Sequence, residues 1–185
     1  ANPFVKVTAF GTEITSHLIG LYNATNICVA ITIGHFFKVP IEDIKEAIES
    51  YVPENNRSQL MVKNTNEIIL DAYNANPSSM KVALENFIQL DKPDKIVVIG
   101  DMYELGQESM NEHKSIVDFL STNEALTCYF VGKDFYANQR LKDNFFFYET
   151  FDEFAKTLSA LHWQNKTILI KGSRGMALER TLELI

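Results

Sequence analysis

Residues 95–106 read Lys-Ile-Val-Val-Ile-Gly-Asp-Met-Tyr-Glu-Leu-Gly, an unbroken apolar run that ends in a polar turn. Residues 167–175 repeat this arrangement as Thr-Ile-Leu-Ile-Lys-Gly-Ser-Arg-Gly. Apolar runs without a polar face are typical of central strands in a parallel sheet, because helices cover such strands on both sides. The two runs therefore predict an α/β fold with core strands at residues 95–99 and 167–170.

Further strand and helix patterns alternate around these two runs. Three more strands are expected at residues 67–70, 126–131 and 145–148. The spacing of apolar residues predicts helices at residues 79–90, 108–120, 135–141, 152–161 and 175–184. This repeated order favours a mostly parallel sheet with helices on both faces.

The N-terminal part of the chain has a different pattern. Residues 4–10 and 12–18 alternate around a glycine turn and predict a hairpin. Helices are expected at residues 23–37 and 41–51, the second beginning after Pro40. The polar stretch at residues 52–56 breaks the pattern. We therefore expect a small α+β unit at residues 1–56 and the main domain at residues 57–185.

Composition restricts the class of function. The chain has 185 residues, of which 46% are hydrophobic and 22% charged, as in a folded globular protein. Its net charge of -7 repels a polyphosphate backbone, which argues against sequence-independent binding of nucleic acid. Because there is no apolar run of about 18 residues and no signal peptide at Ala1, we expect a cytoplasmic protein without membrane insertion.

The two cysteines, Cys28 and Cys128, lie far apart, and each stands in an apolar run. Free thiols in such runs behave as small hydrophobic side chains. Neither their number nor their spacing favours a disulfide or a metal site. Both are therefore predicted to be buried thiols in a reducing compartment.

Polar turns follow the expected strands at residues 71–77, 100–106, 132–133 and 171–175. Right-handed crossovers bring the carboxyl ends of parallel strands to one edge of the sheet, and ligands of open α/β sheets bind there. The four turns together are therefore a candidate binding site.

Two of these turns carry the chemistry of nucleotide or anion binding. Asp71 could accept hydrogen bonds from ribose hydroxyls. The alternative for Asp71 and its neighbours Asn74 and Asn76 is ordinary turn and helix-cap chemistry, which the residues alone favour. Its position in a turn predicts that Asp71→Ala leaves folding nearly unchanged. The turn with Lys171 and Arg174 suits a carboxylate or phosphate, or is simply a solvated loop.

The central turn departs from known phosphate-binding patterns. Gly100 and Gly106 enclose two acidic residues and do not form G-x-G-x-x-G, and the chain contains no G-x-x-x-x-G-K-[ST]. His113 follows this turn and could point back at the site, although a lone histidine is more often a satisfied core residue or lies on a helix surface.

Taken together, these motifs resemble the C-terminal half of the Mur ligases in order and spacing. The segments that carry the resemblance are residues 71–80 (Asp-Ala-Tyr-Asn-Ala-Asn-Pro-Ser-Ser-Met), residues 100–106 with His113, residues 171–174, residues 20–26 (Gly-Leu-Tyr-Asn-Ala-Thr-Asn) and residues 56–57 (Asn-Arg). The departures are Leu21 and Tyr22, where many members have Arg and His.

The resemblance implies a domain organisation. Mur ligases have an N-terminal domain for the UDP-sugar, a central ATPase domain with the P-loop and a C-terminal Rossmann-like domain. By this likeness, residues 1–56 are the C-terminal remnant of the central ATP-binding domain and residues 57–185 are the Rossmann-like domain. The chain is then a fragment whose partners include the missing domains of the same protein.

The resemblance also assigns residues to ligands. It implies ATP-binding roles for Asn23, Asn26, Arg57 and Asp71. It implies roles on the side of the incoming substrate for residues in two turns: Asn74, Asn76, Lys171, Ser173 and Arg174. No catalytic residue and no metal ligand is expected in this chain, because the P-loop and the Mg²⁺ ligands of the family belong to the absent part.

The implied chemistry is ATP-driven amide formation, closest to that of members that join D-alanyl-D-alanine to UDP-N-acetylmuramoyl-tripeptide through an acyl phosphate in peptidoglycan precursor synthesis. The cofactors are ATP and Mg²⁺. This chain would close over ATP, with residues 52–58 as the hinge, and would be inactive alone because it lacks the phosphate clamp. The alternatives are a fragment of a ligase similar to folylpolyglutamate synthase, and a non-catalytic nucleotide- or anion-binding module.

Overall fold

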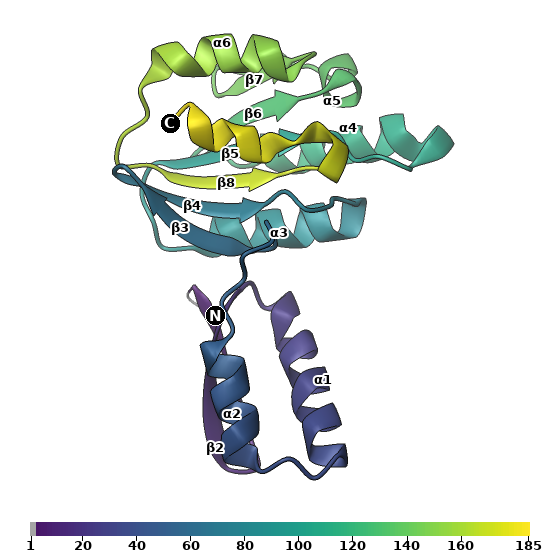
Figure 1. Cartoon of the computed structure of the whole chain (residues 1–185). Coiled ribbons are helices and arrows are strands. Elements are labelled where there is room, and N and C mark those ends of the chain that lie inside the picture. The colour runs from purple at the N-terminus through teal and green to yellow at the C-terminus, as the bar shows by residue number, and fades with distance from the viewer. Residues whose placement is uncertain (1–2) are drawn as a thin grey trace.

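The computed structural model describes residues 3–185 and shows two bodies, one above the other, joined by residues 51–58 (Figure 1). The smaller body contains β1 (Phe4–Ala9), β2 (Thr12–Ile19), α1 (Tyr22–Phe36) and α2 (Ile41–Ser50). The larger body contains all the remaining elements (Figure 1). We call them the small body and the main body.

In the small body, β1 and β2 form an antiparallel hairpin that makes a sheet of its own. Gly11 has a φ of 80° in the connecting turn, a conformation that glycine adopts without strain. The two helices pack on the hairpin over a core of Val5, Ile14, Ile27, Ile31 and Ile44. The predicted hairpin and both predicted helices are confirmed to within one or two residues.

The main body is built on a six-stranded sheet with the strand order β3-β4-β8-β5-β6-β7. The five strands from β4 to β7 in this order are parallel, and β3 is an antiparallel edge strand. Their bounds are Gln59–Lys63 (β3), Asn66–Asp71 (β4), Lys95–Gly100 (β5), Thr127–Val131 (β6), Phe145–Tyr148 (β7) and Thr167–Lys171 (β8). The two apolar runs thus form neighbouring central strands, as predicted.

Helices cover both faces of this sheet (Figure 1). On one face, α3 (Pro77–Gln89), α4 (Ser109–Ser121) and α5 (Lys133–Ala137) share a buried cluster with the sheet. On the other face, α6 (Phe151–Leu161) and the C-terminal segment pack over Tyr129, Trp163 and the apolar side chains of β8. The predicted α/β class is confirmed: a mostly parallel sheet with helices on both sides.

The sequence analysis missed one strand, and two of its expected helices are wrong. Strand β3 was not predicted; it pairs with β4 through a tight turn in which Asn64 has a φ of 54°. The helix expected at residues 135–141 is the shorter α5. The helix expected at residues 175–184 is instead two 3-10 segments, Arg174–Met176 and Leu178–Glu183, because Ala177 between them is left-handed with a φ of 48°.

The expectation for the cysteines holds for one of the two. Cys128 is buried in β6, whereas Cys28 is exposed on α1. The apolar residues of α1 are distributed around the whole circumference of the helix, so their spacing does not indicate which face is covered. Among residues 3–185, no helix has the length and apolar character needed to cross a membrane.

Candidate functional site

The turns that follow β4, β5 and β8 meet at one edge of the sheet, as predicted. Ser173 links them: its hydroxyl accepts a hydrogen bond from the Tyr103 N–H at 2.8 Å and donates one to the Ala75 carbonyl at 3.4 Å. Its own N–H donates to the Asp101 carbonyl. Because Ser173 is 2% exposed, this predicted substrate residue shapes the edge from within.

Asp71 and Lys171 form an ion pair at this edge. They are register partners at the ends of β4 and β8, and Lys171 Nζ lies 2.6 Å from Asp71 Oδ2. Lys171 Nζ also donates to the Asn74 carbonyl at 3.2 Å, and the Ser58 N–H donates to Asp71 Oδ1 at 3.0 Å. The Lys171 side chain is 2% exposed and that of Asp71 15%, so the carboxylate alone reaches solvent.

Arg57 lies beside this pair and is exposed. Its guanidinium stacks on the Tyr73 ring, with Cζ 3.8 Å from the ring centroid. Within residues 3–185 it has no carboxylate partner. A guanidinium held by stacking alone keeps its hydrogen-bond donors available for an anion.

Asn23 and Asn26 lie on the first turns of α1, in the small body. The buried Asn23 amide donates to the Ile19 carbonyl at 2.8 Å and its Oδ1 accepts from Asn26 Nδ2 at 3.0 Å. Asn26 is exposed. Asn23 therefore holds Asn26 in place, and Asn26 is the member of this pair that can reach a ligand.

The two asparagines predicted after β4 form local contacts. Asn74 Oδ1 accepts a hydrogen bond from the Ala75 N–H at 2.9 Å. Asn76 is the N-cap of α3, where its Oδ1 accepts from the Ser79 N–H and its N–H donates to Ser79 Oγ. These are the turn and cap contacts of the alternative interpretation.

Arg174, in the last predicted turn, is largely exposed. Its guanidinium pairs with Glu179 at 3.1 Å, and the Arg174 side chain is 61% exposed. An exposed ion pair of this kind contributes little to stability, so the guanidinium can exchange its partner readily.

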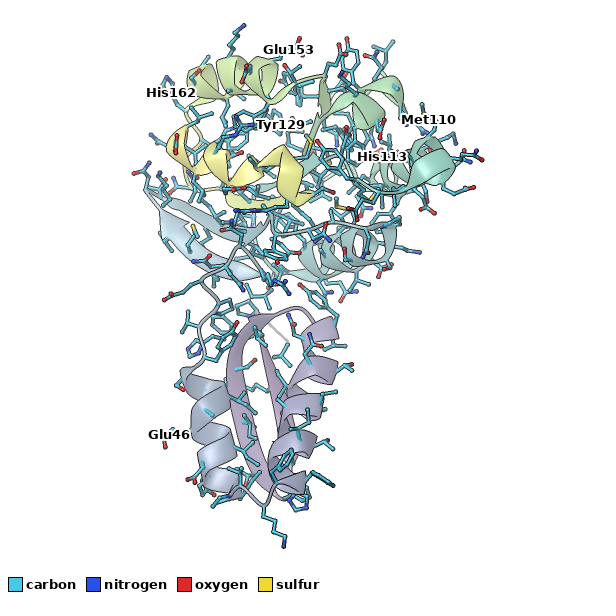
Figure 2. All side chains as sticks on the ribbon, turned by 45° about the vertical axis from the view of Figure 1, so that its right-hand side comes forward. Glu46, Met110, His113, Tyr129, Glu153 and His162 are labelled. Atoms are coloured by element: carbon cyan, nitrogen blue, oxygen red, sulfur yellow. The ribbon has the colours of Figure 1, made fainter. Side chains whose placement is uncertain are left out.

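His113 is a satisfied core residue. It lies on the covered side of α4 (Figure 2) and is fully buried. Its Nε2 accepts from the Met102 N–H at 2.9 Å, and its Nδ1 lies 2.7 Å from the Ser109 carbonyl oxygen. This arrangement requires a neutral ring that donates through Nδ1. His113 therefore fixes the turn at residues 100–106 rather than facing a ligand.

Asp101 performs a second structural task in the same turn. Both of its carboxylate oxygens accept backbone hydrogen bonds, from the N–H groups of Asp134 and Phe135 at the start of α5. Burial raises the pKa of this carboxyl above its ordinary value, an effect that those two hydrogen bonds oppose. Asp101 thus joins the turn after β5 to the turn after β6.

An open depression of about 460 Å³ lies beyond these turns and is lined in part by residues of the predicted turns 100–106, 132–133 and 171–175. It has cationic side chains from Lys133 and Arg180 and carboxylates from Asp134 and Glu149. Arg180 stacks on Phe151, with Cζ 4.0 Å from the ring centroid, and the Lys133 side chain forms no hydrogen bond or ion pair within the described part of the chain. The predicted turns gave the signal for Lys133, whereas nothing in the sequence pointed to Arg180, which comes from a segment expected to be helical.

The polar groups exposed at the site are of the kinds that can bind a nucleotide or another small charged ligand. Among residues 3–185, no group of three or more His, Cys, Asp or Glu side chains could hold a metal ion. The exposed groups are a carboxylate, guanidinium groups and an amide, which suit hydroxyl, phosphate and carboxylate partners.

Comparisons with known proteins identify the family of the chain. The family model described as "Mur ligase, glutamate ligase domain" matches residues 56–174. The chain is 30% identical to the UDP-N-acetylmuramoyl-tripeptide--D-alanyl-D-alanine ligase of Treponema pallidum, over 97% of this chain and 40% of that relative.

Solved structures of Mur ligases have a similar fold. A crystal structure of MurF from Acinetobacter baumannii has a TM-score of 0.81 at 26% identity, covering 93% of this chain and 39% of that one. MurF ligase from Thermotoga maritima in complex with ADP shares the fold, with a TM-score of 0.76 at 20% identity, covering 98% of this chain and 42% of that one. The chain thus spans about two fifths of the length of these relatives. By the match over residues 56–174, it belongs to the Mur ligase family.

Proposed function

We propose that this chain is part of an ATP-dependent amide ligase that adds D-alanyl-D-alanine to UDP-N-acetylmuramoyl-tripeptide in peptidoglycan precursor synthesis. The relative from Treponema pallidum bears the name of this activity. The observation that carries the proposal is the juxtaposition of Asp71, paired with Lys171, and the unpaired Arg57 guanidinium at the carboxyl end of β4. These are groups for a ribose and a phosphate at an edge where α/β sheets bind nucleotides.

We also propose that the chain divides into two domains, at residues 1–56 and 57–185. The small body keeps its strands in a sheet separate from that of the main body. Its helix α1 exposes Val29, Ile33 and Phe36, which are 52%, 54% and 77% accessible. Contiguous apolar surface of this kind is typical of a face that another part of a protein covers, which supports the interpretation as a remnant of a central ATPase domain.

The nucleotide half of the site involves three residues. Asp71 would accept the ribose hydroxyls, Arg57 would meet phosphate oxygens, and Asn26 would contact the base. When bound, ATP supplies the phosphoryl group that activates the tripeptide carboxyl. The ligands of Mg²⁺ would lie in the part of the ligase beyond this chain.

The incoming dipeptide would occupy the depression beside Lys133 and Arg180. A dipeptide is a zwitterion, and the depression offers cations for its carboxylate and the carboxylates of Asp134 and Glu149 for its ammonium group. Arg174 directly precedes Gly175 and Met176, which line the same depression, and its exposed guanidinium would contact the dipeptide from there. Lys171, Ser173, Asn74 and Asn76 would shape the turns behind it.

Steady-state kinetics of the longer protein that contains this chain test the proposal. We expect Arg57→Ala to raise the KM for ATP by about 10- to 100-fold, the range for one charge-assisted hydrogen bond. Lys133→Ala and Arg174→Ala should raise the KM for D-alanyl-D-alanine and leave that for ATP unchanged. Lys114→Ala, on the exposed side of α4, is the matched control. Equal effects on both substrates would contradict the division of the site, and absence of amide formation would contradict the function.

A further inference from the structure

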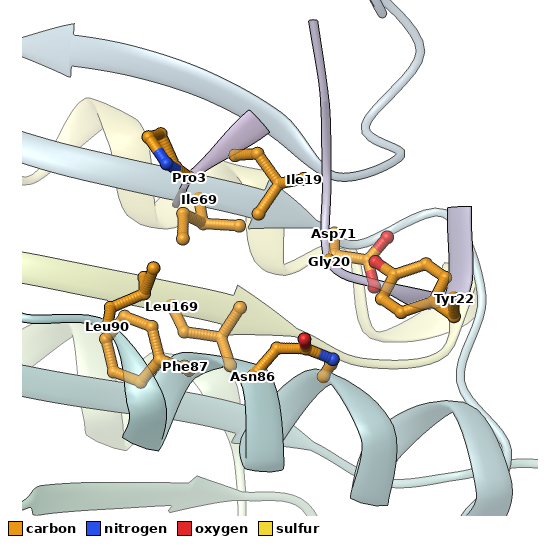
Figure 3. A pocket seen from close by; sticks show the side chains of 11 residues that line it. Pro3, Ile19, Gly20, Tyr22, Ile69, Asp71, Asn86, Phe87, Leu90 and Leu169 are labelled. Atoms are coloured by element: carbon orange, nitrogen blue, oxygen red, sulfur yellow. The ribbon is translucent and has the colours of Figure 1, made fainter. Parts of the chain in front are cut away.

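Side-chain packing fills only part of the contact between the two bodies, which we call the joint. Ile19 of the small body is buried in the core cluster of the main body. Phe4, which is partly exposed, packs against the same cluster. A cavity of about 20 Å³ remains in the joint, between Ile19 on one side and Phe87 and Leu169 on the other (Figure 3). An open groove of about 440 Å³ runs alongside, between Leu21 and α3. The apolar contact between the two bodies thus rests on Ile19 and Phe4 and covers only part of the joint.

Polar contacts complete the joint. The Tyr22 hydroxyl lies 2.5 Å from Ser58 Oγ, and the Leu21 N–H donates to Asn86 Oδ1 at 3.2 Å. Ser58 is 5% exposed, and its N–H donates to Asp71 Oδ1. Tyr22, Ser58, Asp71 and Lys171 thus form one continuous set of contacts from the start of α1 to the end of β8.

The backbone before α1 leaves room for the Tyr22 ring. Gly20 has a φ of 87°, and a Cβ there would lie 2.4 Å from the ring. Figure 3 shows the ring beside Gly20 and Asp71. Partial burial and the nearby Asp71 carboxylate raise the pKa of Tyr22 to about 12. Like any tyrosine hydroxyl, it is protonated at neutral pH and can donate a hydrogen bond.

We infer that Tyr22 is a latch: its hydrogen bond to Ser58, the last residue of the connecting segment, which Asp71 fixes to the main body, holds the small body against the main body. The inference follows from the joint alone and does not depend on the proposed ligase activity. Because the Ser58 N–H also donates to Asp71, the latch ends on the residue that contacts this carboxylate.

Distance measurements between spin labels test the latch in the 185-residue chain. One nitroxide is attached to Cys28, which is exposed on α1, and the other to a Lys81→Cys variant on the exposed side of α3. Cys128 stays unlabelled because it is buried, and burial raises the pKa of its thiol to about 12. Double electron–electron resonance then gives the distribution of distances between the two nitroxides, and from it the populations of molecules with the two bodies joined and parted.

We expect Tyr22→Phe and Ser58→Ala each to raise the ratio of parted to joined molecules by about 2- to 10-fold, the factor that one hydrogen bond contributes. The double variant should add nothing to either single variant, because both remove the same bond. Tyr51→Phe, at an exposed tyrosine of the connecting segment, should match the unmodified protein. An unchanged distribution in either single variant, or effects that multiply in the double variant, would overturn the inference.

Discussion

Single residues at the sheet edge combine structural and binding roles. Asp71 ends β4 and holds a lysine that solvent barely reaches, while one face of its carboxylate remains accessible. The residue proposed to bind ribose is therefore also the partner of a buried charge. The expectation that Asp71→Ala leaves folding unchanged treated this position as a turn, and the ion pair changes that expectation.

We predict that Asp71→Ala destabilises the chain by about 3–5 kcal/mol, because Lys171 then keeps a buried ammonium with only the Asn74 carbonyl as its partner. Adding Lys171→Met should recover most of this loss, since the double variant buries no unpaired charge. Urea denaturation gives both free energies of unfolding. If the double variant is no more stable than Asp71→Ala, the cost arises elsewhere than in the ion pair.

A second residue-scale prediction concerns Gly132. Its φ is 128°, and a Cβ there would lie 2.2 Å from Cγ of Asp101, the side chain that caps α5. Gly132→Ala should lower the free energy of unfolding by about 3 kcal/mol, through backbone strain and displacement of this cap. Gly106→Ala is the control: its φ is also positive, at 56°, but nothing lies within 4 Å of its Cβ. A loss of about 1 kcal/mol is expected there, and equal losses in urea denaturation would contradict the role of Asp101.

At the scale of elements, the sequence predicted what local patterns control. Apolar runs placed β5 and β8, and their order among helices led to the parallel sheet. Edge strand β3 is half-buried, and its pairing depends on the turn at Asn64. The C-terminal segment has apolar spacing, but Leu178 must pack over Gly100 and Gly172, and the left-handed Ala177 allows this at the cost of helical continuity. Such long-range contacts leave no local signal.

The same limit applies to the site. The turns themselves were predicted because strand ends are visible in the sequence. Whether a side chain in a turn faces a ligand or the protein depends on packing, which is why Asn76 and Ser173 have internal partners. Lys133 and Arg180 come from segments distant in sequence and meet only in the folded chain.

Helix α3 allows the two roles of Asn76 to be separated. Because Asn76 caps this helix, Asn76→Ala should reduce stability by about 1 kcal/mol and Asn76→Asp should retain it. Thr150→Ala, at the equivalent capping box of α6, should cost a similar amount and provides the control. Thermal unfolding measures both. If Asn76→Ala leaves the melting temperature unchanged, the cap is not what this residue contributes, and contact with the substrate becomes its remaining role.

At the scale of the whole molecule, the chain provides positioning groups without a phosphate clamp. Phosphoryl transfer depends on cationic and backbone groups that surround the transferred phosphate. The 185 residues contain no P-loop sequence and have a net charge of -7, and Arg57 is one guanidinium at the edge of the joint. In the proposed function, this chain would therefore close over a nucleotide that another part of the ligase mainly holds.

We therefore predict that the 185-residue chain alone releases no phosphate from ATP above a buffer blank, with Mg²⁺, UDP-N-acetylmuramoyl-tripeptide and D-alanyl-D-alanine present. A single guanidinium cannot replace the several contacts by which phosphoryl-transfer enzymes stabilise the transition state. The measurement is phosphate release followed across a size-exclusion peak, with an Arg57→Ala variant purified in the same way as the control for contaminating ATPases. Release that follows the chain through the column and disappears in Arg57→Ala would show that the chain holds a phosphate-clamping site of its own. Equal release by both proteins would identify a contaminant and leave the chain inactive, as predicted.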